Sequence, residues 1–368
     1  MEPTEITRST AIEFCREILP AVSRTFSISI RLLPGELGAA IRCAYLICRI
    51  ADTIEDERTF SADEKAALFD ALTVVLSKPV VLSDESSRPA VVSEATDPSP
   101  YRDPLQQLVE SASRLTSNPA DRRLVESARL VVVAYHDLPE VTRGHVRRWT
   151  TEMIVGMRKF VLAYPHGVRI QSLDEYKEYC YYVAGTVGYL VTDLWHEHSP
   201  SIGKRRYAML RERCQGFAEA LQTVNILKDV AKDAEQENSI YIPEQLLRAH
   251  GGAHATIFAP ERANATRAAL STLIQLAWRD LEQAKAYVLT IPRRAVAIRL
   301  SCALPLLFAY ATLRDLTRLV EHPVRDGVVK ISRAEVKSLT ILSIAGVLSN
   351  RAMSSLVERA RRKPVVVF

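Results

Sequence analysis

Apolar residues recur at intervals of three and four positions over most of the chain, which is the spacing of one face of an α-helix. This periodicity predicts helical structure over residues 5–76, 105–162, 173–197 and 204–232. The alternation of apolar and polar residues that marks a strand is nowhere sustained. The sequence therefore predicts an all-α protein.

Three stretches add detail to this pattern. Residues 301–313 are apolar on all sides despite Pro305, which predicts a helix buried at the centre of the molecule. The last helix is predicted over residues 333–361. Between residues 78 and 104 the chain turns to Ser, Pro, Asp and Val without a helical period, which predicts a surface loop or a disordered insertion. We interpret it as an insertion within one domain of residues 1–368, and not as a domain boundary.

Composition agrees with a helical, globular protein. Of the 368 residues, 48% are hydrophobic and only 13 are glycine, which favours helices. The net charge of +5 is small, and no basic run is interleaved with aromatic residues in the manner of a nucleic-acid groove. We therefore expect small anionic ligands and no nucleic acid.

The six cysteines lie far apart or within apolar stretches and include no C-x-x-C pair, so we expect free thiols in a reducing compartment. The first residues lack the features of a signal peptide, and no apolar run approaches the roughly 20 residues of a membrane helix. A cytoplasmic location is predicted. The basic segment 359–368 can contact an anionic membrane surface; the alternative is a frayed tail without a partner.

The first candidate for chemistry is the acidic end of a predicted helix. Asp52 and Asp56 are separated by four residues and share a helix face, with Glu55 adjacent. Two carboxylates placed side by side repel each other unless a hard cation such as Mg²⁺ bridges them. Arg49 and Tyr45 continue the face with groups suited to a diphosphate. A solvated acidic face is the alternative.

The second candidate repeats this arrangement. Asp229 and Asp233 form another pair at i and i+4, and Asn225 and Gln222 extend the same face with neutral amides. These polar residues interrupt an apolar context, which a solvated face does not explain well. Two aspartate pairs on separate helices are what a site for several Mg²⁺ ions and a diphosphate requires.

The third candidate is a stretch of small residues that follows Tyr179. Glycines within a helix cost about 1 kcal/mol each relative to alanine, so Gly185 and Gly188 admit something close to the backbone. Tyr179, Val183 and Val187 fall on one stripe, which would place a phenol at the head of an apolar trough for an isoprenoid chain. Tight helix–helix packing is the alternative reading.

Taken together, these motifs resemble the squalene/phytoene synthase family over nearly the whole chain. The resemblance is carried by four motifs: Ser23 to Phe26 with Arg24, Tyr45 to Asp56, Tyr179 to Gly188, and Gln222 to Asp233. Two further stretches, 302–313 and 328–335, are similar to the squalene synthases within this family.

The resemblance implies a single-domain isoprenoid synthase fold, a helical bundle around a central apolar cavity. It implies a prenyltransferase that joins two farnesyl diphosphates head to head through presqualene diphosphate and reduces this to squalene with NADPH. The implied metal ligands for Mg²⁺ are Asp52, Glu55, Asp56, Asn225, Asp229 and Asp233. The implied catalytic residues are Tyr179 and the four aspartates. The implied substrate-binding residues are Ser23, Arg24, Phe26, Tyr45, Arg49, Val183, Val187, Gln222, Asn225 and Lys228. Peripheral membrane contact for product release is also implied.

Lys330 and Arg333 lie in the stretch that resembles the basic loop associated with the NADPH-dependent step, and they are the predicted cofactor-binding residues. A basic pair on a solvated turn is the alternative. No G-x-G-x-x-G follows a strand, so an NADPH site would not be of the Rossmann type. Two positions depart from the family pattern: Lys228 stands where arginine is usual, and Lys232 stands where an acidic residue is usual.

Two other functions stay open at this point. A synthase that ends by proton loss would give phytoene or dehydrosqualene without NADPH. A non-catalytic family member acting as an assembly partner is a different class of function, and the presence of all four aspartates argues against it.

Overall fold

Helices form almost all of the regular structure in the computed structural model, which describes residues 7–23, 26–77, 103–321 and 329–366. Within these residues no strand is present, and the only β-bridge joins Arg169 to Ile240. The helices are α1 (Arg8–Val22), α2 (Phe26–Arg31), α3 (Gly35–Asp56), α4 (Ala62–Ser77), α5 (Pro104–Ser111), α6 (Pro119–Glu126), α7 (Ala128–His136), α8 (Glu140–Ala163), α9 (Leu173–Cys180), α10 (Thr186–His198), α11 (Lys204–Arg211), α12 (Cys214–Gln236), α13 (Glu244–Arg248), α14 (Ala263–Thr290), α15 (Val296–Glu321), α16 (Arg333–Gly346) and α17 (Asn350–Arg362). The predicted all-α class is confirmed.

Local sequence signals set many of the helix boundaries. The side chains of Asp103, Asn118, Ser172 and Ser332 each accept a backbone N–H in the first turn of the helix that follows. Such caps satisfy backbone donors that have no partner inside the helix and stabilise it by about 1 kcal/mol each. The predicted segment 78–104 lies almost wholly outside the described residues, and the expectation of a single domain stays a prediction.

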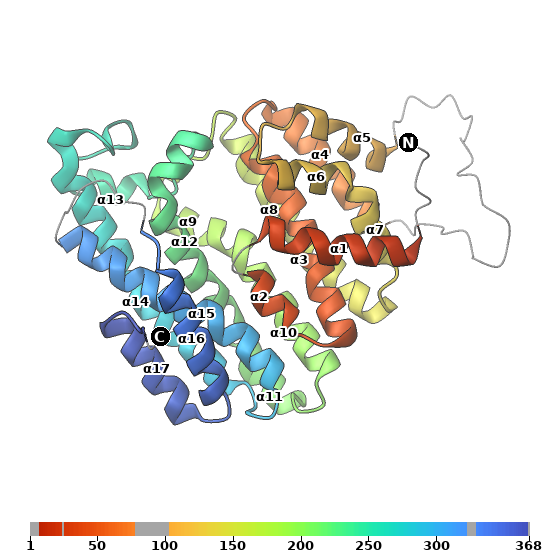
Figure 1. Cartoon of the computed structure of the whole chain (residues 1–368). Helices are drawn as coiled ribbons and strands as arrows, with labels where there is room; N and C mark the ends of the chain where they lie inside the picture. The colour runs from red at the N-terminus through yellow and green to blue at the C-terminus, as the bar shows by residue number, and fades with distance from the viewer. Residues whose placement is uncertain (1–6, 24–25, 78–102, 322–328, 367–368) are drawn as a thin grey trace, which may run out of the picture.

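Two long helices organise the two halves of the molecule (Figure 1). In the first half, α3 packs against α1, α4, α7 and α8. In the second half, α15 packs against α2, α12, α14, α16 and α17. The helices α8, α10 and α12 pack in sequence and connect the halves. These packing contacts fix the positions of the acidic ends of α3 and α12.

The central position of α15 confirms the burial predicted for residues 301–313. Ala303, Leu304, Leu306 and Leu307 are fully buried, and the helix continues through Pro305. By length and composition the part Val296–Val320 could also cross a membrane, but 89% of its most apolar window is buried in the protein. This burial is typical of a core helix.

The predicted last helix, 333–361, is wrong in one respect, because the structure has two helices there. α16 ends at Gly346, and the hydroxyl of Ser349 accepts the N–H of Ala352 to begin α17. A glycine at a helix end followed by a serine cap is a strong signal for a break. The periodicity of apolar residues continued across this break and hid it.

A buried ion pair fixes both helices to α15. Arg314 and Glu335 are each 3% exposed at the side chain, and the guanidinium donates to both carboxylate oxygens at 2.8 and 3.0 Å. Arg314 also donates to the carbonyl of Ala360, and Glu335 accepts the N–H of Val365. Val365 is fully buried, so the segment is not a frayed tail up to this residue.

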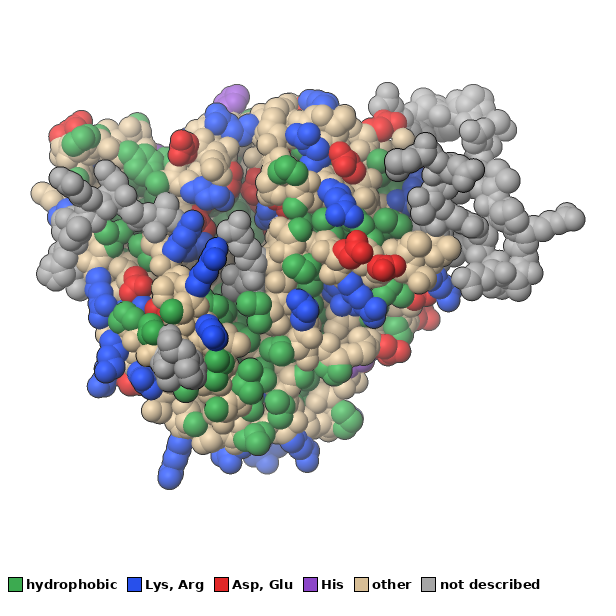
Figure 2. Space-filling model, in the orientation of Figure 1, with side chains coloured by type: hydrophobic (Ala, Val, Ile, Leu, Met, Phe, Trp, Pro, Cys, Tyr) green, Lys and Arg blue, Asp and Glu red, His purple; other side chains and the backbone are tan. Residues whose placement is uncertain are grey.

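The face shown in Figure 2 carries hydrophobic side chains in its lower part, with Lys and Arg side chains around them. Exposed apolar residues include Phe26 and Ile28 of α2 and Ile341 and Ile344 of α16. Both of these helices pack against α15.

Close packing of α10 on α12 yields a first testable prediction. A Cβ added at Gly188 would lie 2.2 Å from the carbonyl oxygen of Cys214, so Gly188→Ala forces the helices apart. We expect the free energy of unfolding to fall by about 1–3 kcal/mol in urea denaturation. Gly144→Ala in α8 is the matched control, since nothing lies within 4 Å of its Cβ position, and it should stabilise by about 0.5–1 kcal/mol. Equal effects of the two changes would contradict the packing role of Gly188.

Candidate active site

The C-terminal half of α3 carries the first group of predicted residues. Tyr45, Arg49, Asp52 and Asp56 lie on one face because they are spaced by three or four residues along the helix. The side chain of Asp52 is 37% exposed, and its pKa is raised to about 7, mainly by desolvation, against the opposing cation of Arg49. The pKa of Asp56 is raised to about 6, again mainly by desolvation. A nearby cation would therefore stabilise the ionised form of both carboxyls.

Arg49 has a different partner from the one expected. Its guanidinium donates two hydrogen bonds, of 2.9 and 2.7 Å, to the carboxylate of Asp121, and it lies 4.0 Å from Asp52. This two-point pair with a buried carboxylate fixes the guanidinium, and the role of Arg49 in diphosphate binding stays a prediction. Sequence reasoning missed Asp121. Its only signal is its position in the first turn of α6, after the Asn118 cap.

On α12 the second aspartate pair forms the predicted stripe with Gln222 and Asn225. Asp233 is only 8% exposed, and desolvation together with the neighbouring Asp229 raises its pKa to about 7. Lys228 donates to Asp229 at 2.6 Å. Gln222 is half-buried and Asn225 is exposed. The ammonium of Lys228 is therefore bound to an aspartate in this structure.

The ends of α3 and α12 meet. Arg58, two residues beyond α3, donates to the carbonyl of Glu235 on α12 at 3.2 Å. The charge of Asp56 raises the pKa of Asp233, and the charge of Lys232 lowers the pKa of Asp56. The structure thus brings the two predicted aspartate pairs to one place.

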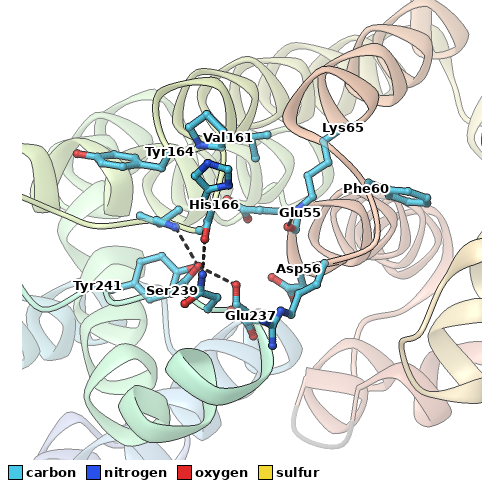
Figure 3. A pocket seen from close by; sticks show the side chains of 15 residues that line it. Glu55, Asp56, Phe60, Lys65, Val161, Tyr164, His166, Glu237, Ser239 and Tyr241 are labelled. Carbon is cyan, nitrogen blue, oxygen red and sulfur yellow. Dashed lines mark hydrogen bonds between the residues drawn. The ribbon is translucent and has the colours of Figure 1, made fainter. Parts of the chain in front are cut away.

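A cavity of about 220 Å³ lies where the two helix ends meet (Figure 3). Glu55 and Asp56 line it from α3, and Glu237 and Tyr241 line it from the segment after α12. The Oε1 atom of Glu55 is buried without a hydrogen-bond partner among the described residues. A buried carboxylate oxygen without a donor is costly, so this atom points to a missing cation or donor.

Tyr179 lies beside this cavity, next to a second phenol that the sequence did not reveal. Its ring stacks on Tyr241 at a centroid distance of 4.8 Å and meets the edge of Phe160 at 5.1 Å. Burial and the charge of Glu55 raise the pKa of Tyr179 well above its usual value, and the two tyrosine hydroxyls are hydrogen-bonded. Tyr179 is therefore a neutral phenol at neutral pH. Tyr241 follows α12 outside any helix, where periodicity carries no signal.

The small-residue stretch serves packing at its glycines. Residues Tyr181–Gly185 form a π-helical turn between α9 and α10, which changes the register of the predicted stripe. At Gly185 a Cβ would come within 3.2 Å of Gln215 and Glu219 of α12. Close approach of helices therefore explains Gly185 and Gly188. Val183 and Val187 are half-buried and pack against the core, and their contact with an isoprenoid chain stays a prediction.

The predicted substrate residues near the start of the chain lie close to Tyr45. The hydroxyl of Ser23 accepts the N–H of Phe26 at 3.2 Å, and it also forms a hydrogen bond with Tyr45. The ring of Phe26 is 37% exposed and lies 6.0 Å from that of Tyr45. Arg24 lies outside the described residues.

Lys330 and Arg333 are not among the residues that line this cavity. Both are exposed, and Arg333 is the first residue of α16, after the cap of Ser332. A role in cofactor binding stays a prediction.

The residues at the helix ends fit Mg²⁺ when it arrives with a diphosphate. Within the described residues, no three His, Cys, Asp or Glu side chains are grouped closely enough to hold a metal ion alone. Mg²⁺ commonly takes one or two carboxylates and completes its coordination with substrate phosphates and water. The carboxylates of Asp52, Asp56, Asp229 and Asp233, with the unpartnered oxygen of Glu55, suit that arrangement.

Comparison with known proteins shows which family this chain resembles. A family model described as squalene/phytoene synthase matches residues 19–335. The squalene synthase of Schizosaccharomyces pombe is 23% identical over 335 residues, which are 90% of this chain and 65% of that protein. The chain thus spans slightly less than two thirds of that relative's length.

Solved structures share the fold. A complex of TcSQS with the ligand BPH1237 superimposes with a TM-score of 0.70 at 20% identity, covering 96% of this chain and 98% of the other. A dehydrosqualene synthase in complex with ligand gives a TM-score of 0.56 at 18% identity, covering 96% of both chains. Both similarities extend over nearly the whole fold.

The raised carboxyl pKa values predict how pH acts on the metal-free protein. Between about pH 4 and 7 the buried Asp233 stays protonated in the folded state while the unfolded chain releases this proton, so stability falls as pH rises. In EDTA, Asp233→Asn should raise the stability at pH 8 by roughly 1–3 kcal/mol and change little at pH 4. Melting temperatures across pH 4–8 measure this. Glu235→Gln, at an exposed position on the same helix, should follow the wild type, and a parallel response of the two variants would contradict the assignment.

Proposed function

The chain belongs to the squalene/phytoene synthase family, a family of prenyltransferases, and from this we propose that it joins two farnesyl diphosphates head to head through presqualene diphosphate and reduces this to squalene with NADPH. The observation that carries the proposal is the meeting of two aspartate pairs, from α3 and α12, at one site.

The aspartates would act on the diphosphate leaving group. Asp52, Asp56, Asp229 and Asp233 would hold Mg²⁺, with Glu55 and Asn225 as further ligands, and bound Mg²⁺ would neutralise the departing diphosphate. Lys228 lies next to Asp229 and can turn to a diphosphate oxygen once metal takes over the carboxylate. Tyr45 and Gln222 would contribute a hydroxyl and an amide as further hydrogen-bonding groups for the diphosphate.

The apolar walls would protect a carbocation from water. Phe26, Val183 and Val187 are only partly buried by the protein itself, and so they offer surface to a C15 chain. The buried helix α15 packs against α2, which carries Phe26. Exclusion of water keeps the cation from being quenched before the second substrate captures it.

Tyr179 is proposed to act at the reacting carbons and not at the metal. A neutral phenol hydrogen-bonded to a second phenol can steady a positive charge through its oxygen and ring, or pass on a proton. The pairing with Tyr241 keeps the hydroxyl oriented inside a buried site.

Two contacts outside the active site belong to the proposal. Squalene is a hydrocarbon, so its release favours a nearby membrane, and the exposed apolar side chains on α2 and α16 with basic residues around them suit a peripheral contact of a cytoplasmic protein (Figure 2). Lys330 and Arg333 are exposed cations that would meet the phosphates of NADPH.

The aspartate site predicts loss of activity without loss of fold. Asp52→Asn and Asp229→Asn should each lower turnover of farnesyl diphosphate by roughly 100-fold or more, because each removes a ligand needed for ionisation. Circular dichroism should stay helical. Asp174→Asn, at an exposed position on α9, is the control and should keep wild-type turnover. Near-normal activity of either site variant would end the two-cluster proposal.

The identity of the product tests the reductive step. With farnesyl diphosphate, Mg²⁺ and NADPH the wild type should give squalene, and K330A/R333A should accumulate presqualene diphosphate or unreduced products while the first step continues. K204A/R205A removes an exposed basic pair at the start of α11 and should make squalene normally. A wild type indifferent to NADPH would instead assign phytoene or dehydrosqualene formation, the alternative in keeping with the similarity to a dehydrosqualene synthase.

A further inference from the structure

The stripe of metal-site candidates on α12 continues one turn beyond the predicted motif. Asn225, Asp229 and Asp233 are spaced by four residues, and Glu237 is the next position in this series. Although α12 ends at Gln236, the N–H of Glu237 still donates to the carbonyl of Asp233 at 3.0 Å. Glu237 therefore keeps the helical hydrogen bond and extends the same face by one carboxylate.

The backbone directly after Glu237 is fixed by unusual contacts. Asn238 has a φ of +53°, which a residue other than glycine seldom adopts. A Cβ added at Gly167 would lie only 2.0 Å from the carbonyl oxygen of Asn238. Arg169 donates a hydrogen bond of 2.8 Å to the side chain of Asn238. Its own amide donates to the carbonyl of His166. Backbone of this kind is retained where the position of a neighbouring side chain matters.

Glu237 opens onto the cavity that contains the acidic end of α3. Figure 3 shows Glu237, Glu55 and Asp56 around this cavity, the first from the end of α12 and the other two from the end of α3. The carboxylate of Glu237 makes no hydrogen bond or ion pair with another described residue, and the Oε1 atom of Glu55 is also unpartnered. Carboxylates held together in a half-buried place without partners are stabilised by a proton or by a bound cation.

Lysine side chains nearby do not supply that cation. Lys65 donates to the backbone carbonyl of Glu55, and Lys228 is bound to Asp229. Lys232 is exposed, on a neighbouring face of α12. Arg58 also lines the cavity, and its guanidinium donates to the carbonyl of Glu235. Within the described residues none of these cations forms an ion pair with Glu237, so its carboxylate can accept a cation brought by the ligand.

We propose that the carboxylate of Glu237 completes the α12 side of the diphosphate–Mg²⁺ site, as a sixth acidic residue beside the two aspartate pairs and Glu55. This inference rests on the proposed function, because it takes the aspartate site to be the place where a diphosphate binds with its metal. It assigns to Glu237 the retention of metal and diphosphate at the mouth of the site.

The test measures binding of inorganic diphosphate and needs no turnover. In equilibrium dialysis of labelled diphosphate against increasing Mg²⁺, E237Q should raise the Mg²⁺ concentration for half-saturation about tenfold, the usual lower range for loss of a group that supports a metal. E237D keeps the charge on a shorter side chain and should lie between E237Q and wild type. E235Q, two residues earlier and exposed, should bind as the wild type does.

The variant D56N separates this inference from the proposed function. If D56N weakens diphosphate binding while E237Q matches the wild type, the role of Glu237 is overturned and the aspartate site stands. If D56N and E237Q both bind as the wild type, the proposed site itself is wrong. Circular dichroism and melting temperatures of each variant confirm that the helices remain folded.

Discussion

The burial of several carboxylates at the meeting point of α3 and α12 is the constraint on which the site depends. Protein interiors do not hold several acidic groups together without cost, and the pKa values of Asp52, Asp56 and Asp233, raised mainly by desolvation, express that cost. The surrounding helices keep these groups close all the same. A fold that stabilises such an arrangement before any cation arrives is ready for a highly charged ligand, and the rest of the structure can be understood as its support.

That support comes from the helices that pack against α3 and α12. On one side α3 is packed by α1, α4, α7 and α8, and Arg49 is anchored by Asp121. On the other side α12 lies on α14 and α15 and closes against α10 through Gly188. Apolar burial thus fixes the position of polar side chains, and the glycine that resembled part of a substrate trough proved to be one of the packing contacts.

Helix class, the buried central helix and both aspartate pairs could be predicted because each is encoded by local spacing. Residues such as Asp121 and Tyr241 could not, since their importance arises from contacts with segments far away in the chain. Periodicity also failed at residues 347–349, where a serine cap breaks a continuous apolar pattern. For Arg49 the sequence predicted the position on the helix face, but it did not predict the partner, Asp121. The roles of the site residues themselves stay predictions.

The ion pair between Arg314 and Glu335 bears on how the second half of the molecule assembles. The buried guanidinium of Arg314 pairs with its neighbour Asp315 within α15, and its other partners are Glu335 of α16 and the carbonyl of Ala360 in α17. These contacts couple the burial of α15 to the docking of the last two helices. In native-state hydrogen exchange these three helices would open as one foldon, although α16 and α17 lie at the surface where independent fraying is the usual behaviour.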